Sequence, residues 1–241
     1  MSTTTSFTLN RDQVISYTLR KCGVLELGVV PDNYTIDSAQ LALNLLIKNW
    51  IVKGIKLWTQ TELVLPLVAG QTVYTVGPAG PDLVTDKPQK MIQAFLRNTT
   101  NPQALDIPLM MISNRDYNIL GSKFSQGTPN SIYCDINRDN AQFSLYLTPD
   151  TFSQSTYQVH IVSQRLLQDV SQSTDNLDFP QEWLLPIAWG LAAEIGLDNG
   201  LEMDKLDYIE KKANKYLTDM EDWDAEYTSL YFTPDIRYTQ K

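Results

Sequence analysis

The order of hydrophobic periodicities along the chain restricts its fold more than any single motif does. Apolar residues recur every three to four positions near both ends, whereas most segments between residues 57 and 175 alternate with a period of two. These are the periods of amphipathic helices and of half-buried strands. The sequence therefore predicts an α+β fold. Residues 1–56 and 176–241 form a helical domain with a C-terminal arm, and residues 57–175 form an inserted, antiparallel β-rich domain.

Two helices are expected before the strand-like region. The first covers residues 11–22, with Asn10 as its N-cap and Gly23 as its stop. The second begins after Asp37, its candidate N-cap, and apolar residues recur at helical spacing until Gly54 ends it. Each helix therefore has one apolar face to bury against other elements.

Two more helices are expected near the C-terminus. Asp178 is a candidate N-cap for the first, and Pro186 within its apolar pattern predicts a kink or a later start. The last helix covers about residues 202–227 and has one apolar and one charged side. The apolar side consists of Leu206, Ile209, Ala213, Tyr216, Leu217, Met220, Trp223 and Tyr227. Helices from both ends of the chain must then find each other in space.

Seven segments in the middle of the chain have the pattern of strands. They are residues 63–65, 73–76, 91–97, 105–112, 131–137, 142–147 and 157–163. The first two flank Ala69-Gly70-Gln71 and predict a hairpin. A short helix over residues 114–120, capped by Ser113, interrupts the series. Short strands in this number favour a β-sandwich or a small barrel.

The charge of the chain argues against a protein that grips nucleic acid. The chain has 28 acidic and 19 basic residues, a net charge of −9, whereas neutralising phosphates requires an excess of lysine and arginine. Residues 176–241 hold most of the acidic excess, and acids concentrated on one helix can repel a polyanion. The acidic candidates for lining a channel are Asp219, Glu221, Asp222, Asp224 and Glu226.

Few residues are available for catalysis or metal binding. The two cysteines, Cys22 and Cys134, cannot form a disulfide framework, and a single histidine, His160, rules out multi-histidine metal sites. Phosphate-binding and nucleophile-elbow motifs are also missing. We therefore assign no catalytic, cofactor or metal residues and expect no enzyme. Because the chain has no signal peptide and no apolar run of about 18 residues, we expect folding in the cytoplasm and no membrane partner.

A calcium-loop pattern begins at Asp135. Asp135 to Asp139 reads D-x-N-x-D, but Asn140 and Tyr146 stand where a calcium loop needs glycine and glutamate. The flanking strands favour a polar hairpin turn instead.

Two other features permit acid–base chemistry. His160 shares a strand face with Gln158 and Val162, and we expect it on the outward or edge side rather than as a base. Glu182 and Glu194 are candidates for the carboxylate pair of a saccharide hydrolase, although a solvated helix face is the favoured explanation, since a chain with 28 acids always offers some pair. A tail-associated hydrolase of cell wall or saccharide therefore stays as the alternative function.

Several segments, in order along the chain, resemble the head-to-tail adaptor proteins of short-tailed bacteriophages. Residues 17–25 are similar to the pattern A-L-R-x-x-G-V-[IL], with Thr18 in place of the usual alanine. The other similar segments are residues 37–58 (A-x-x-x-L-N-x-[ML]-[IL]-x-x-W-x-x-x-G-[IL]-x-[LI]-W), 70–77 (G-Q-x-x-Y-x-[VLI]-G), 127–133 with 145–149 (G-x-P-x-x-[YF] and L-x-[LF]-x-P), and 178–194 ([DN]-[FL]-P-x-[ED]-[WF] and L-A-x-E).

The resemblance implies a structural virion protein. Members of this family, called connector, tail accessory factor or tail tubular protein, form a dodecameric ring under the portal. The implied partners are the portal protein, the downstream nozzle or tube protein, further copies of the chain, and DNA that passes without tight binding. The implied location is the head–tail junction of a virion assembled in the host cytoplasm. Some members have been linked to saccharide hydrolysis, but no catalytic motif of theirs can be transferred to this sequence.

The last residues, 228–241, show no helical or strand period but are rich in aromatic residues. Such a segment either packs along its own domain or docks on a partner. By resemblance to related adaptors, we expect an arm whose side chains anchor in portal crevices. The anchoring residues are Tyr231, Phe232, Pro234, Ile236 and Tyr238.

Overall fold

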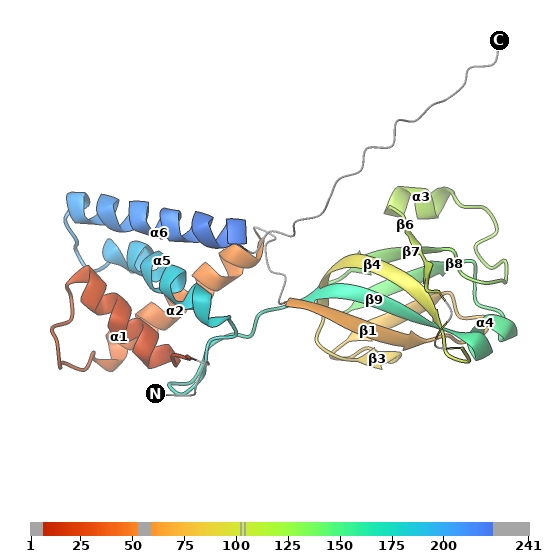
Figure 1. Ribbon diagram of the computed structural model, residues 1–241, viewed down its shortest axis with the longest axis horizontal. Coiled ribbons are helices and arrows are strands. Elements are labelled where there is room, and N and C mark those ends of the chain that lie inside the picture. The colour runs from red at the N-terminus through yellow and green to blue at the C-terminus, as the bar shows by residue number, and fades with distance from the viewer. Residues whose placement is uncertain (1–6, 53–58, 102, 104, 224–241) are drawn as a thin grey trace, which may run out of the picture. The chain divides into compact units, whose positions relative to one another are not determined.

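The computed structural model divides the chain into two compact units, which Figure 1 shows. A helical unit contains residues 1–57 and 170–241, and a β unit contains residues 58–169. The structure describes residues 7–52, 59–101, 103 and 105–223. The expected α+β class with a β-rich insertion is confirmed.

The helical unit is built around α5 (Leu184–Gly196), which contacts α1 (Arg11–Cys22), α2 (Asn33–Val52) and α6 (Met203–Trp223). Ile187 and Leu191 of α5 are fully buried. Gly190 allows α2 to approach α5 closely, since a Cβ atom there would lie 3.1 Å from the ring of Trp50. Elements from both ends of the chain thus share one core.

The start of α1 follows the sequence prediction residue by residue. The Asn10 side chain accepts a hydrogen bond from the backbone N–H of Gln13, and the Gln13 side chain accepts one from the N–H of Asn10. This capping box satisfies N–H groups that the first helical turn leaves without partners. At the other end, Gly23 adopts a φ of 73°, which glycine tolerates without strain.

The predicted start of α2 is wrong by one turn. The helix begins at Asn33 instead of after Asp37, because the Asp32 carboxylate accepts a hydrogen bond of 2.6 Å from the backbone N–H of Thr35. The hydrogen bond with the Thr35 side chain, followed by this one to its backbone, lowers the pKa of Asp32 below its usual value. Both aspartates suit a cap chemically, and the structure uses the earlier one.

The predicted cap at Asp178 is also wrong, because α5 starts late. A short 3₁₀ turn, η2 (Gln181–Trp183), precedes α5, so that Pro186 falls within the first turn of the helix. A proline is tolerated there because the first N–H groups have no partner within the helix. Of the two outcomes that Pro186 predicted, the later start is the observed one.

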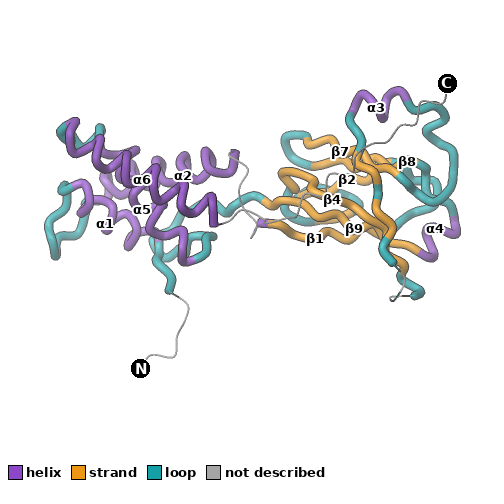
Figure 2. The backbone as a smooth tube through the Cα atoms, turned by 45° about the horizontal axis from the view of Figure 1, so that its top comes forward, coloured by secondary structure: helices purple, strands orange, loops and turns teal. Residues whose placement is uncertain are grey.

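The β unit consists of two sheets, seen from a second direction in Figure 2. The four-stranded sheet has the order β1 (Gln60–Pro66), β9 (Tyr157–Arg165), β4 (Pro88–Asn98) and β5 (Ile107–Pro108). The five-stranded sheet has the order β3 (Leu83–Val84), β2 (Val73–Gly77), β8 (Ala141–Tyr146), β7 (Ser131–Ile136) and β6 (Met110–Met111). Two short helices, α3 (Asn114–Ile119) and α4 (Thr151–Thr156), lie in the connections.

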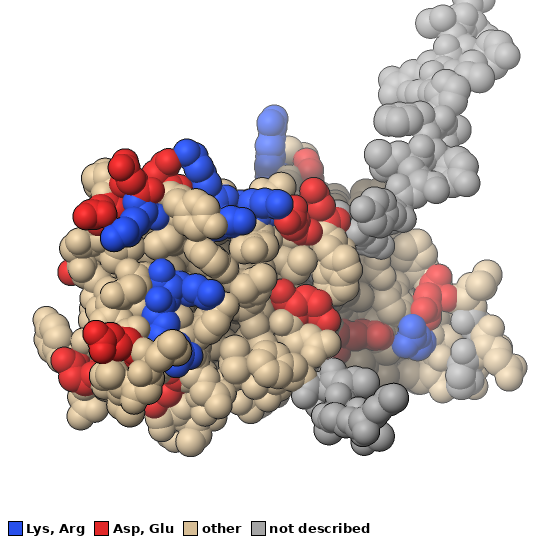
Figure 3. Space-filling view, turned by 60° about the vertical axis from the view of Figure 1, so that its left-hand side comes forward, with Lys and Arg blue, Asp and Glu red and all other residues tan. Residues whose placement is uncertain are grey.

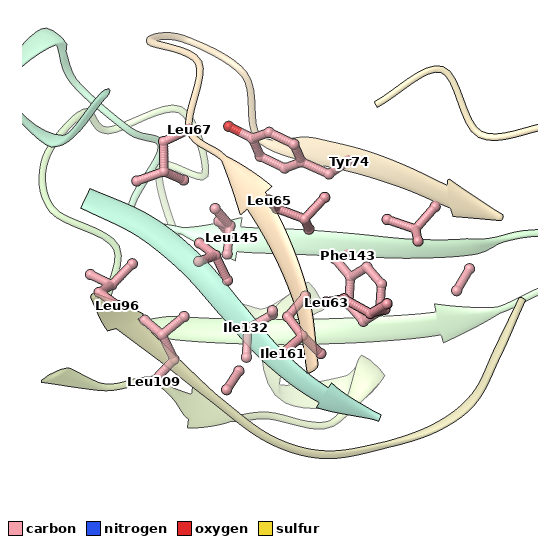
Figure 4. Close-up of a cluster of buried hydrophobic side chains, with 14 residues drawn as sticks. Leu63, Leu65, Leu67, Tyr74, Leu96, Leu109, Ile132, Phe143, Leu145 and Ile161 are labelled. Carbon is pink, nitrogen blue, oxygen red and sulfur yellow. The ribbon is translucent and has the colours of Figure 1, made fainter. Parts of the chain in front are cut away.

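The core of the β unit lies between these two sheets. Leu63 and Leu65 of β1 pack with residues of the opposite sheet such as Phe143 and Leu145, as Figure 4 shows. All four side chains are at most 9% exposed. Alternate residues of each strand supply this core, as expected for strands with one buried face.

Three expectations about the strands need correction. The segments around Leu63 and Tyr74 are not a hairpin: β1 pairs with β9, and β2 pairs with β8 and β3. The single strand expected over residues 105–112 is divided into β5 and β6, which belong to different sheets on either side of the buried Leu109. The described residues contain nine strands instead of seven. Alternation shows which face a residue occupies but does not identify the partner strand.

The predicted helix capped by Ser113 is confirmed as α3.

Candidate interaction surfaces

The described part of α6 includes three of the acidic candidates. Asp219, Glu221 and Asp222 lie near the end of the described part of α6, whose last described turn holds no basic residue. Asp224 and Glu226 lie outside the described residues, as do the proposed arm residues Tyr231, Phe232, Pro234, Ile236 and Tyr238.

A second surface combines lysines with aromatic rings, and we call it the lysine–aromatic face. Trp189 of α5 lies 6.4 Å from Tyr208 and 6.2 Å from Tyr216 of α6, measured between ring centroids. Lys21 of α1 places its Nζ atom 5.7 Å from the centre of the Trp189 ring, and Lys212 does the same over Tyr208. Cation–π contacts of this kind hold the charged groups beside apolar surface.

The lysine–aromatic face is hollowed. A cavity of about 280 Å³ lies among Lys21, Trp189, Lys205 and Tyr208, and Asp204 also lines it. Figure 3 shows lysine and arginine side chains, bordered by acidic ones, on the face of the helical unit that is turned to the viewer. An open apolar hollow with basic groups around it suits an acidic or apolar partner.

A third surface is apolar, exposed and free of basic residues, and we call it the acidic–apolar face. Tyr34, Leu41 and Leu45 lie on the outward side of α2 with exposures of 84%, 63% and 62%. In the loop before α2, Leu27 and Val30 are 90% and 83% exposed. The acidic residues of this segment are Glu26, Asp32 and Asp37, and residues 22–47 contain no lysine or arginine. Large exposed apolar side chains gathered over one segment mark an interaction site.

His160 lies on the outward side of its strand, as expected, since its neighbours Val159 and Ile161 face the core, but its side chain is buried rather than exposed. The residue is 6% exposed, and its ring stacks on Phe95 with a centroid distance of 5.3 Å. Its Nδ1 atom lies 2.5 Å from a carboxylate oxygen of Glu62. Arg97 donates to Glu62 at 3.3 Å and to Asp106 at 2.9 Å, and the pKa of Asp106 is lowered chiefly by the hydrogen bond from Arg97.

This cluster links neighbouring strands on the outer face of the four-stranded sheet. His160 pairs with Val64 in β1 and with Phe95 in β4, so that Glu62 is its diagonal neighbour on the same face. Glu62 and His160 are 98 positions apart in the sequence. Only the strand pairing could have revealed their contact, which explains why the sequence pattern missed it.

The structure confirms the turn interpretation of the calcium-like motif. The strands β7 and β8 form a hairpin, and the backbone N–H of Asn137 donates to the carbonyl of Asn140 at 3.0 Å. Within residues 7–52, 59–101, 103 and 105–223, no group of three or more His, Cys, Asp or Glu side chains could hold a metal ion.

The two carboxylates considered for hydrolysis are too far apart to act as a pair. Glu182 lies in η2 and Glu194 near the end of α5, and both are exposed. At about 1.5 Å of rise per residue, a separation of twelve positions places them roughly 18 Å apart along the helix. Paired carboxylates in glycosidases are about 5–10 Å apart, so this particular pair is excluded.

A comparison with known protein families gives the decisive finding. Residues 25–234 match the family model of the SU10 adaptor protein, a range that takes in most of both units. The chain belongs to this family. It is thus a structural protein of the phage head-to-tail adaptor class, and the resemblance drawn from its sequence motifs is confirmed. A search of curated proteins finds no match.

For a member of an adaptor family, exposed interaction surfaces are a more suitable kind of site than a catalytic cleft. The adaptor family implies interaction with portal and tail proteins, so exposed apolar and charged faces are the features that serve such a role. Among the described helices, none has the length and apolar character needed to cross a membrane. The acidic–apolar face was not foreseen, because Leu41 and Leu45 fall outside the buried stripe of α2 and single exposed leucines are common on helices.

Proposed function

We propose that this adaptor forms a dodecameric ring under the portal, extends the DNA channel and provides the platform for the next tail protein. The observation that carries the proposal is the family match over residues 25–234. It is supported by the exposed faces of the helical unit, which a lone subunit would leave in water. Assembly takes place in the host cytoplasm, and the ring then resides at the head–tail junction of the virion.

The C-terminal residues make the contact with the portal in this proposal. Tyr231, Phe232, Ile236 and Tyr238 are anchors for crevices on the portal, and Pro234 restricts the backbone between them. Aromatic anchors bury a large apolar area while fixing few rotatable bonds. Four anchors at roughly 1.5–3 kcal/mol for each buried side chain offset the few kcal/mol that ordering such a segment costs.

Acidic residues near the end of α6 face the channel in this proposal. The candidates are Asp219, Glu221, Asp222, Asp224 and Glu226. A negative channel wall lowers the affinity for phosphate and allows DNA to slide.

Binding to the portal of the same phage tests the proposed function. Tagged portal immobilised on a surface is expected to retain the purified adaptor at physiological salt, whereas an unrelated portal retains none. Retention by neither portal would contradict the proposal. Hydrolysis of purified host cell wall by the adaptor would favour the alternative of a tail-associated hydrolase.

A further inference from the structure

We propose that neighbouring copies of the chain contact each other head to tail, with the acidic–apolar face of one copy packed on the lysine–aromatic face of the next. The inference rests on the proposed function in one respect, since a ring requires contacts between copies. It goes further by assigning the two faces and by specifying that they differ. The occupant of each face is therefore a second copy of this chain.

The two faces are complementary in charge. Residues 22–47 carry Glu26, Asp32 and Asp37 and no basic residue. The opposing face carries Lys21 and Lys212 over aromatic rings, and it carries Lys205, which pairs with Glu202, beside a cavity that Asp204 also lines. A contact of the acidic–apolar face with itself would bring carboxylates together, whereas a contact with Lys21 and Lys212 pairs opposite charges.

The two faces are also complementary in shape and polarity. One presents protruding apolar side chains, of which Tyr34 is 84% and Leu41 63% exposed. The other offers a cavity of about 280 Å³ bordered by the rings of Trp189 and Tyr208. A tyrosine such as Tyr34 that enters an aromatic hollow is typical of a binding hot spot.

One copy cannot join its own two faces. The outward side of α2 and the ring cluster on α6 belong to a single packed unit, in which α5 contacts both helices. Figure 1 shows the N-terminal part of α2 on the side of α5 away from α6. A contact between two different patches on the same body is heterologous, and repeated contacts of this kind close into a ring when the rotation between copies permits.

Paired variants test the contact in the full-length protein. Leu41→Ser with Leu45→Ser disables the acidic–apolar face, and Lys205→Glu with Lys212→Glu disables the lysine–aromatic face. Each variant is expected to weaken association at least tenfold in sedimentation at high protein concentration. Ile119→Ser, a similarly exposed apolar residue of the β unit, and Lys211→Glu, which like Lys205 pairs with a nearby carboxylate but lies outside the lysine–aromatic face, serve as matched controls that leave association unchanged. Circular dichroism verifies that every variant folds.

Mixing the two disabled variants separates a heterologous contact from a symmetric one. Each variant retains one intact face, so an equimolar mixture is expected to give a complex of two subunits that grows no further. A symmetric contact predicts instead that the variant with the self-pairing face intact associates with itself and that no mixed complex forms, and this result would overturn the proposal. Free growth to larger assemblies would overturn it equally.

Charge reversal supplies a rescue. Glu26→Lys with Asp37→Lys is expected to weaken association, and adding Lys205→Glu with Lys212→Glu to the same chain is expected to restore it. A carbodiimide, which joins a lysine directly to a carboxylate in contact with it, should link these two segments between copies in a mixture of ¹⁴N and ¹⁵N protein. Cross-links from α6 to α6 would instead contradict the proposal.

The outcome also distinguishes this inference from the proposed function. If all variants form the same ring on the portal as the unmodified chain, the assigned faces are wrong and the adaptor function stands. If the variants behave as expected but the unmodified chain never binds a portal, the contact between copies stands and the adaptor function as proposed is wrong.

Discussion

Leu191 in α5 offers the sharpest test of how the two ends of the chain build one unit. Its side chain is fully buried in the helix that contacts α1, α2 and α6. Replacing such a leucine with alanine removes apolar contacts and leaves a cavity, at a cost of about 2–5 kcal/mol. For a unit of about 130 residues, a loss of about 3 kcal/mol lowers the melting temperature by about 10–15 °C.

Tryptophan fluorescence follows this unit selectively. Four of the five tryptophans, Trp50, Trp183, Trp189 and Trp223, belong to the helical unit. The fifth, Trp58, is replaced by phenylalanine in the background used for all measurements. Leu191→Ala is then expected to shift the fluorescence transition in urea by the stated free energy.

Two matched leucines complete the experiment. Leu197, which is 61% exposed, is expected to cost less than about 0.5 kcal/mol when replaced with alanine. Leu96→Ala, in the core of the β unit, is expected to leave the fluorescence transition in place, because each unit has its own core. The reasoning is refuted if Leu96→Ala moves that transition as far as Leu191→Ala does, or if Leu191→Ala costs less than about 1 kcal/mol.

Three further predictions concern the arm, the channel and the thiols. Deleting residues 229–241 is expected to abolish attachment to the portal while changing the melting temperature little; a much lower melting temperature with binding intact would show that the segment packs on its own domain. The assembled ring is expected to bind DNA only weakly in a filter assay at physiological salt, and tight binding would contradict a negative channel wall. Burial raises the pKa of Cys22 and of Cys134 to about 11. In the folded protein these thiols stay neutral up to a higher pH than in the unfolded chain. Their contribution to the free energy of unfolding is therefore complete below about pH 9, the usual thiol pKa. It is lost as the pH rises toward 11. Iodoacetamide should therefore react slowly at pH 8 and faster as the pH approaches 11, and rapid labelling at pH 8 would contradict the assigned burial.

Local signals in the sequence predicted the helices well where one solution dominated. Asn10 and Gly23 mark the two ends of α1. Their effects are local, because a capping side chain and a residue that tolerates positive φ both act on backbone groups only a few positions away. The start of α2 was harder, since Asp32 and Asp37 both have the chemistry of a cap. The sequence alone does not show which of the two carboxylates makes the capping hydrogen bond, and in the structure it is that of Asp32.

Pairing between distant segments was beyond the reach of pattern analysis. Leu63 and Tyr74 face the same core from different sheets, and their alternation is the same as that of a hairpin. The contact of His160 with Glu62 has the same origin, because a carboxylate 98 positions away becomes a neighbour only through the pairing of β1 with β9. The acidic–apolar face was missed because exposure of individual leucines is visible only after the buried side of α2 is known.

Stoichiometry on the portal tests the central claim most directly. Native mass spectrometry of the adaptor alone, of the portal alone, and of their mixture gives the number of adaptor copies that each portal carries. The account predicts a monomeric or weakly associated adaptor in isolation and a dodecameric ring of adaptor in the mixture. A stable adaptor dimer whose mass the portal does not change would contradict it.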